Sequence, residues 1–133
     1  MKKFTLKSVA AILFVSFSLT SCSNDDGGET VIIQNEFVAA ATAPETGVVN
    51  QDITIDLKYM ADNACGQFNK FVETTNGNTK IIEVQVKYIG TDCGENPSEV
   101  ALPYTFKVNQ PGTYTFKFKR NASQYLTRVV TVE

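Results

Sequence analysis

Three cysteines, Cys22, Cys65 and Cys93, are the side chains of this 133-residue sequence that are best suited to covalent chemistry. A thiol can form a disulfide, hold a metal, act as a nucleophile or carry a lipid. The sequence has no histidine, which removes the commonest general base and the commonest metal ligand. The spacing of Cys65 and Cys93 excludes a CxxC redox motif, and two cysteines without histidine are too few for structural zinc.

The sequence around Cys22 is typical of an export signal. Residues 1–21 begin with lysines and continue with about 11 mostly apolar residues, too few to span a bilayer, which needs roughly 20. The tetrapeptide LTSC that ends at Cys22 resembles the bacterial lipobox. That resemblance implies cleavage before Cys22 and attachment of a lipid to its thiol. The alternative is an ordinary secretory signal cut near Ser21, which would leave Cys22 free for an intermolecular bridge.

Residues 22–30 are expected to form an acylated cysteine followed by a flexible acidic tether. Ser23 to Glu29, SNDDGGE, contains no apolar side chain and could hold a domain up to about 23 Å from a membrane. Acidic residues after the cysteine resemble the surface-export signal of Bacteroidetes lipoproteins. The implied location is the outer membrane, with a lipid anchor and the domain at the cell surface, and a periplasm-facing domain is the alternative.

The net charge of the mature chain limits the classes of ligand that it can bind. All acidic residues lie after residue 21, whereas Lys2, Lys3 and Lys7 lie before it. The mature chain would therefore carry 9 basic and 14 acidic side chains. This balance argues against nucleic acid and against anionic membranes as ligands, since both require a positive surface.

Residues 31–133 are long enough for one domain with one core, and their apolar residues alternate with polar ones at the period of a β-strand. The segment Ile53 to Tyr59 shows this most clearly. About seven strands are predicted, the first and third with weaker alternation, over residues 31–41, 53–59, 68–73, 82–88, 104–108, 114–119 and 126–132. Turn residues separate them, including the hairpin signal Asn76-Gly77. We expect an all-β, immunoglobulin-like antiparallel sandwich with one disulfide.

Two local features bear on this expectation. The segment NQPGTY, residues 109–114, resembles the tyrosine corner of immunoglobulin-like domains, although Tyr114 could equally be a core aromatic at the start of a strand. Cys65 follows the strand that begins at Ile53, and Cys93 follows the strand that ends near Ile89. If strands alternate up and down, both cysteines lie at the same pole, where an oxidising compartment would let them form a bridge.

The candidate functional residues are better suited to contact a binding partner than to act as catalysts. The carboxylates, hydroxyls and tyrosines are scattered, so we expect no enzyme, no cofactor and no metal site. Acidic residues such as Asp52 and Asp56 match no EF-hand spacing. Phe68 and Phe71 lie three apart in a predicted strand, so they should face opposite sides, with at least one in the core. The loops at the cysteine pole are the expected contact surface, with Asp62, Asn63, Gln67, Phe68, Asp92, Glu95 and Asn96 as candidates.

Four segments resemble small lipoproteins of Bacteroidetes and flavobacteria that carry an immunoglobulin-like domain, and they are SCSNDDGG, ACGQF, DCGEN and PGTYTFKFK. The resemblance implies a location and a fold, and it implies no activity. We expect a membrane-anchored, non-catalytic binding or scaffolding module of the cell envelope, with an envelope protein or a glycan as its partner. The alternatives are a carbohydrate-binding accessory lipoprotein of a glycan-uptake system and an extracellular peptidase inhibitor.

Overall fold

The smaller of two β-sheets forms where the sequence alternates most strictly. In the computed structural model, which describes residues 28–133, every second residue of β4 (Ile53–Ala61) is buried. This strand pairs antiparallel with β2 (Val38–Thr42) on one side and with β7 (Ser98–Phe106) on the other. Because successive side chains point to opposite faces of a strand, β4 turns its apolar side chains toward the second sheet and its polar ones toward solvent.

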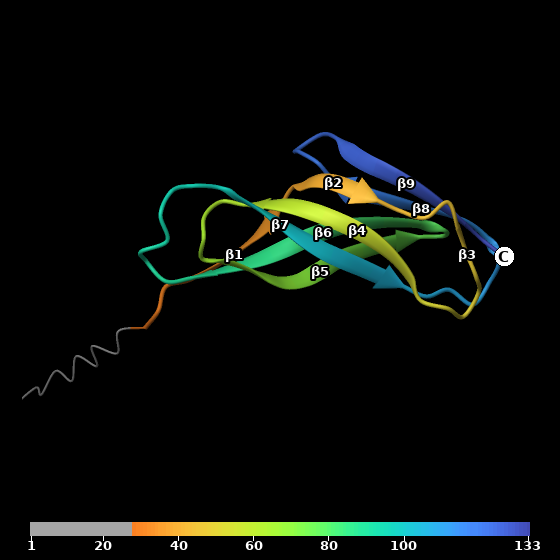
Figure 1. Ribbon diagram of the computed structural model, residues 1–133, viewed down its shortest axis with the longest axis horizontal. Coiled ribbons are helices and arrows are strands. Elements are labelled where there is room, and N and C mark those ends of the chain that lie inside the picture. Colours follow the sequence, from red (N-terminus) through yellow and green to blue (C-terminus); the bar gives the residue numbers. More distant parts are fainter. Residues whose placement is uncertain (1–27) are drawn as a thin grey trace, which may run out of the picture.

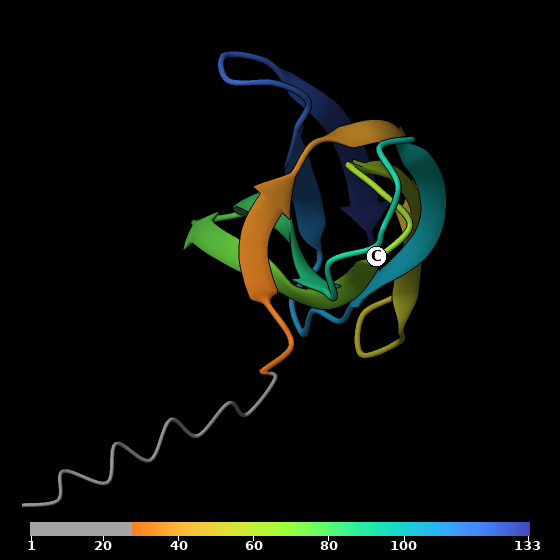
Figure 2. The same cartoon turned by 90° about the vertical axis from the view of Figure 1, so that its left-hand side faces the viewer.

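The larger sheet has six strands, and they are β1 (Val31–Glu36), β3 (Thr46–Gly47), β5 (Gly66–Asn76), β6 (Thr79–Ile89), β8 (Gly112–Lys119) and β9 (Tyr125–Val132). One edge of β6 pairs with β5 along nearly its whole length. The other edge is shared, because residues 84–89 pair with β1 and residues 79–82 pair with β8. The end-on view shows β1 and β2 running one after the other across the side of the sandwich (Figure 2).

The core lies between the two sheets and is built from the inward-facing residues of six strands. It contains the apolar side chains of β4 and β6 together with large aromatics. The rings of Phe106 and Phe116 lie 4.3 Å apart, and Tyr104 contacts both Phe116 and Phe118 edge to face. Aromatic rings bury more apolar area than other side chains, so this cluster is expected to be a main source of stability. The expectation of an all-β sandwich is confirmed.

The strand count and pairing differ from the expected pattern in two respects. The segment 31–41 is two strands, because the chain leaves the larger sheet at Phe37 and enters the smaller one as β2. Of the seven strand pairings between residues 28 and 133, five are antiparallel, whereas β3 with β9 and β6 with β8 are parallel. The part of the chain that the structure describes therefore has nine strands, counting the two-residue β3, where about seven were expected.

Two predicted local motifs are present. The signal Asn76-Gly77 does mark the hairpin between β5 and β6, but the two loop residues are Gly77 and Asn78, and Asn76 pairs with Thr79. Gly77 has a φ of 59°, which glycine adopts without the steric cost of a side chain. The tyrosine corner is confirmed, because the Tyr114 hydroxyl donates a hydrogen bond of 2.8 Å to the backbone carbonyl of Gln110.

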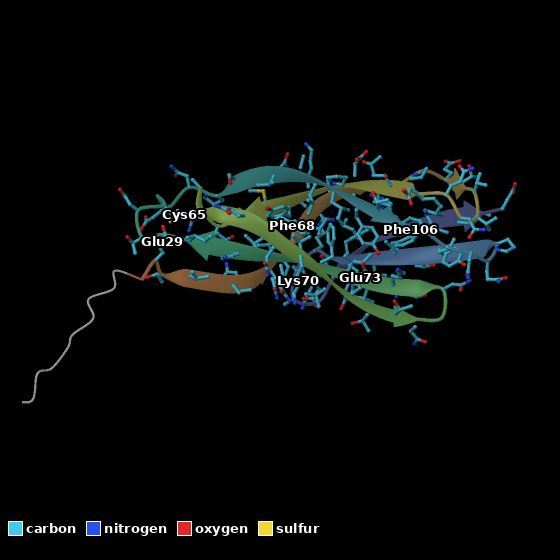
Figure 3. All side chains as sticks on the ribbon, turned by 90° about the horizontal axis from the view of Figure 1, so that it is seen from below. Glu29, Cys65, Phe68, Lys70, Glu73 and Phe106 are labelled. Carbon is cyan, nitrogen blue, oxygen red and sulfur yellow. A yellow bond between two sulfur atoms is a disulfide. The ribbon has the colours of Figure 1, made fainter. Side chains whose placement is uncertain are left out.

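The sandwich is elongated along its strands and has two distinct ends (Figure 1). The disulfide pole carries the loops 62–65 and 90–97 together with the beginning of β1, and Figure 3 shows Cys65 beside Glu29 at this end. The opposite end, which we call the free pole, carries the loops 48–52, 77–78 and 107–111 and the C-terminus. Among the described residues there is no helix long and apolar enough to cross a membrane.

Candidate functional site

The disulfide pole is closed by the bond between Cys65 and Cys93, as predicted. The two Cα atoms lie 5.2 Å apart, within the usual range for a disulfide. Gly90 lies beside both sulfur atoms and has a φ of 111°, a conformation that residues with a side chain rarely adopt. A glycine is therefore required at this point for the chain to leave β6 and reach Cys93.

The chain enters the domain at this same pole. The backbone N–H of Gly90 donates a hydrogen bond to the carbonyl oxygen of Thr30, directly before β1 begins at Val31. Val31, Ile32 and Ile33 are all exposed on this first strand. Cys22, the predicted signal segment 1–21 and most of the predicted tether lie outside the described residues. The start of the domain at Thr30 is nevertheless held beside the disulfide by this hydrogen bond.

The structure divides the predicted contact residues into three groups. Asp62 and Asn63 support the local fold, because the Asp62 N–H donates to the Tyr88 hydroxyl and the Asn63 carboxamide oxygen accepts from the Cys65 N–H. Asp92, Glu95 and Asn96 are exposed on the disulfide-bonded loop. Gln67, which was expected in a loop, belongs to β5, and Phe68 lies in the same strand, where the sequence pattern predicted it.

The expectation that Phe68 and Phe71 face opposite sides is wrong. A β-bulge places Asn69 as an extra residue, so that Phe68 pairs with Val86 and Phe71 pairs with Val84. Val84 and Val86 both face the core, so both phenylalanines lie on the inner side of β5, with their ring centres 4.8 Å apart. Phe71 packs against the core and Phe68 remains 39% exposed at the edge of the sandwich.

A buried carboxylate lies just inside the disulfide pole. Glu36 is only 7% exposed, and its Oε1 accepts hydrogen bonds from the Tyr88 hydroxyl and from the Gln34 side-chain amide. The same Gln34 amide also donates to Asp62, over 2.6 Å. Burial, and next the hydrogen bond to Glu36, raise the pKa of Tyr88 above its usual value near 10. Tyr88 therefore stays a neutral donor, and the four side chains link β1 to β6 and to the end of β4.

A polar hollow lies at the free pole, and we call it the free-pole hollow. Its volume is about 630 Å³, and it is lined by Asn50, Gly77, Asn78, residues 107–110 and Tyr114. Backbone hydrogen bonds join its walls, one of 2.7 Å from the Asn50 N–H to the Val108 carbonyl and one of 2.9 Å from the Thr115 N–H to the Asn78 carbonyl. No lining residue is a carboxylate, although Lys107 forms an exposed ion pair with Asp52.

The free-pole hollow was not among the sites expected from the sequence. The signal was available, because the alternation of strands that places the two cysteine loops at one pole also places the loops 48–52, 77–78 and 107–111 together at the other. Two of these loops carry turn residues, Asn76-Gly77 and Gln110-Pro111-Gly112, which by themselves predict only that one strand ends and the next begins.

A second, smaller depression of about 400 Å³ lies on the outer face of the three-stranded sheet, between β2, β4 and β7. Its lining includes the exposed residues Asp56, Lys58 and Pro103. The exposed ion pair of Lys58 with Glu99, over 2.8 Å, raises the pKa of that lysine. Exposed pairs of this kind contribute little to stability.

The titratable side chains between residues 28 and 133 do not form a grouping with evident chemistry. In that part of the chain no three Cys, Asp or Glu side chains are arranged to hold a metal ion. Asp52 lies at the free pole beside Lys107, whereas Asp92 and Glu95 lie at the disulfide pole. Burial, and next the negative charge of Glu73, raise the pKa of Tyr104, whose hydroxyl is buried among core aromatics.

A family model described as the ORF11 beta-sandwich domain matches residues 55–132, which is more than half of the chain. The match runs from within β4 to the end of β9, so it includes both cysteines of the disulfide and two of the three loops of the free pole. No curated protein and no solved structure matches the chain.

Proposed function

The chain belongs to the ORF11 beta-sandwich domain family, and we propose that its sandwich is a non-catalytic binding or scaffolding module of the cell envelope, anchored through a lipid on Cys22. In this proposal residues 1–21 are removed on export, residues 22–30 are the tether, and the domain binds an envelope protein or a glycan. Its location is the outer membrane, with the domain at the cell surface.

The position of the tether is the observation that carries the proposal. Thr30, the residue before β1, is hydrogen-bonded to Gly90 at the disulfide pole. A lipid on Cys22 would therefore leave this pole within about 30 Å of the membrane, because eight extended residues connect Cys22 to Val31. The free pole would point away from the membrane. The part of the module that meets a partner is then the free pole rather than the disulfide-pole loops expected from the sequence.

A carbohydrate-binding accessory lipoprotein is the second candidate, and the polar free-pole hollow favours it. Sugar-binding sites commonly combine hydrogen-bonding side chains with an aromatic ring, and the hollow has several amides beside Tyr114. Four aromatic residues elsewhere, Phe68, Phe71, Tyr104 and Tyr125, fit the role of a sugar-stacking platform less well. Tyr104 is 2% exposed and Phe71 is half-buried, so Phe68 and Tyr125 are the exposed members, on β5 and β9 respectively.

The anchoring part of the proposal is tested by the mass and location of the full chain expressed in a bacterium that processes lipoproteins. The expected product starts at Cys22, carries acyl groups and sediments with the membranes. The matched control is Cys22→Ser, which should carry no lipid and should lose the membrane association that the acyl chains provide. An unmodified product that starts at another residue would show that the anchoring proposal is wrong.

A further inference from the structure

We infer that the free-pole hollow is a binding site for a neutral, hydroxyl-rich ligand, such as a short segment of a polysaccharide. The inference deepens the proposed function and rests on it for the exposure of the free pole. It names the ligand class and the residues that would recognise it.

The hollow is held in shape by hydrogen bonds between the segments that line it. The loop at Asn50 is bonded to the 107–111 loop by a backbone hydrogen bond, and the Asn78 side chain donates to the Thr113 carbonyl over 3.3 Å. The Tyr114 hydroxyl is bonded to the backbone of Gln110. Asn50 itself has a φ of 61°, a left-handed conformation that these contacts hold in place. A preformed site loses less conformational entropy when a ligand binds.

The free hydrogen-bonding groups of the hollow are side-chain amides. Within the described part of the chain, the amides of Asn50, Asn109 and Gln110 make no hydrogen bond to another side chain or to the backbone. Each amide offers two donors and an acceptor oxygen. A hydroxyl is also both a donor and an acceptor, so closely spaced hydroxyls on a rigid ring complement such a cluster.

The charges around the hollow favour a neutral ligand over a strongly charged one. A cationic ligand would need carboxylates, and the lining has none. An anionic ligand would need free cations, but Lys107 is the lining cation and its Nζ lies 3.2 Å from a carboxylate oxygen of Asp52. The half-buried ring of Tyr114 adds an apolar surface on which the C–H face of a sugar ring can pack. Amides, a neutralised lysine and one aromatic ring together favour a neutral polyol.

The inference is tested on the full chain, purified in detergent, with immobilised hexasaccharides as probes. The neutral probes are the hexamers of glucose in α-1,4 and β-1,4 linkage, of xylose and of mannose, and the charged probe is the hexamer of galacturonic acid. The first variant is Gln110→Ala, which keeps the Tyr114 bond because that bond uses the backbone carbonyl. The second is Asn50→Gly, since glycine tolerates the φ of 61°. The matched control is Asn96→Ala, an exposed amide at the disulfide pole.

The expected result is binding to at least one neutral hexamer, weakened about two- to tenfold by each free-pole variant and unchanged by Asn96→Ala. Binding that Gln110→Ala and Asn50→Gly leave intact would overturn the site. Binding to the acidic hexamer alone, or to none of the probes, would overturn the ligand class. Because the protein is purified in detergent, these results do not depend on the lipid on Cys22, so a failure of the anchoring proposal would be seen separately by mass and fractionation.

Discussion

Removal of the Cys65–Cys93 disulfide should lower the free energy of unfolding by about 3.6 kcal/mol. The bond joins residues separated by 28 positions. On the chain-entropy model, closing a loop of that size removes about 12 cal/mol/K from the unfolded chain, which corresponds to about 3.6 kcal/mol at 25 °C. Small domains are typically stable by about 5–15 kcal/mol, so the loss would be a large share of the total.

The folded state should survive this change in most of its parts. The core lies between the sheets, and the loop 62–65 keeps hydrogen bonds that involve Asp62, Asn63 and Gly66. The loop 90–97 keeps the bond from Gly90 to Thr30 at its first residue. We therefore expect a double variant, Cys65→Ala with Cys93→Ala, that is folded but less stable, with its 90–97 loop loosened.

The assay is urea unfolding of the parent and of the double variant, followed by circular dichroism. With a typical slope of about 1–3 kcal/mol per molar urea, the midpoint should fall by about 1.2–3.6 M. The slope should rise as well, because an unfolded chain without the bridge exposes more surface. A loss below about 1 kcal/mol would refute the reasoning, since it would mean that the bridge hardly restricts the unfolded chain.

Three further substitutions or conditions test other parts of the structure. Tyr114→Phe removes the bond to Gln110 and should cost about 1 kcal/mol in urea unfolding, whereas no loss would show that the corner is dispensable. Phe116→Ala opens a cavity in the core and should cost about 3–5 kcal/mol, and a cost under 1 kcal/mol would contradict its central position. Tyr88 and Tyr104 have pKa values raised by burial, so the folded state holds their protons more tightly than the unfolded state does. Their stabilisation is complete below pH 10 and is lost as the pH rises above it, so stability should fall by about 1 kcal/mol per tyrosine between pH 10 and pH 11. A urea midpoint unchanged over this range would contradict the burial of these hydroxyls.

The parts of the fold that could be predicted from the sequence are those determined by local patterns. The strict alternation of Ile53 to Tyr59 gives a strand with one buried face, because a strand has a side-chain period of two. The disulfide could be predicted because both cysteines follow strands that end at the same pole. The hairpin at Gly77 followed from its turn residues, although the loop proved to be one residue further along than the motif suggested.

The parts that could not be predicted depend on contacts between distant segments or on one inserted residue. Nothing in the local pattern of β6 shows that its edge is divided between β1 and β8, one of them parallel to it. The bulge at Asn69 shifts the alternation by one residue and brings Phe68 to the same side as Phe71. The change of sheet at Phe37 is equally invisible, since the alternation around it is weak.

The candidate site was the least predictable feature. The free-pole hollow is formed by four segments, around Asn50, residues 77–78, residues 107–110 and Tyr114, and each of them alone reads as an ordinary turn or strand start. The hollow is a candidate site because its four segments lie at the pole opposite to the one where the chain enters the domain at Thr30. That position depends on the contact between Thr30 and Gly90, which involves backbone atoms and leaves no trace in residue types.

The orientation of the domain relative to the membrane is tested most directly by energy transfer. The lipidated full chain would be placed in vesicles that contain an acceptor lipid, with a donor dye on Glu95→Cys at the disulfide pole or on Asn109→Cys at the free pole. The nine residues of β4 alone extend about 30 Å between the two poles, so the two dyes should differ clearly in distance from the membrane. We predict markedly stronger transfer from position 95 than from position 109. Equal transfer, or stronger transfer from position 109, would contradict a free pole that points away from the membrane.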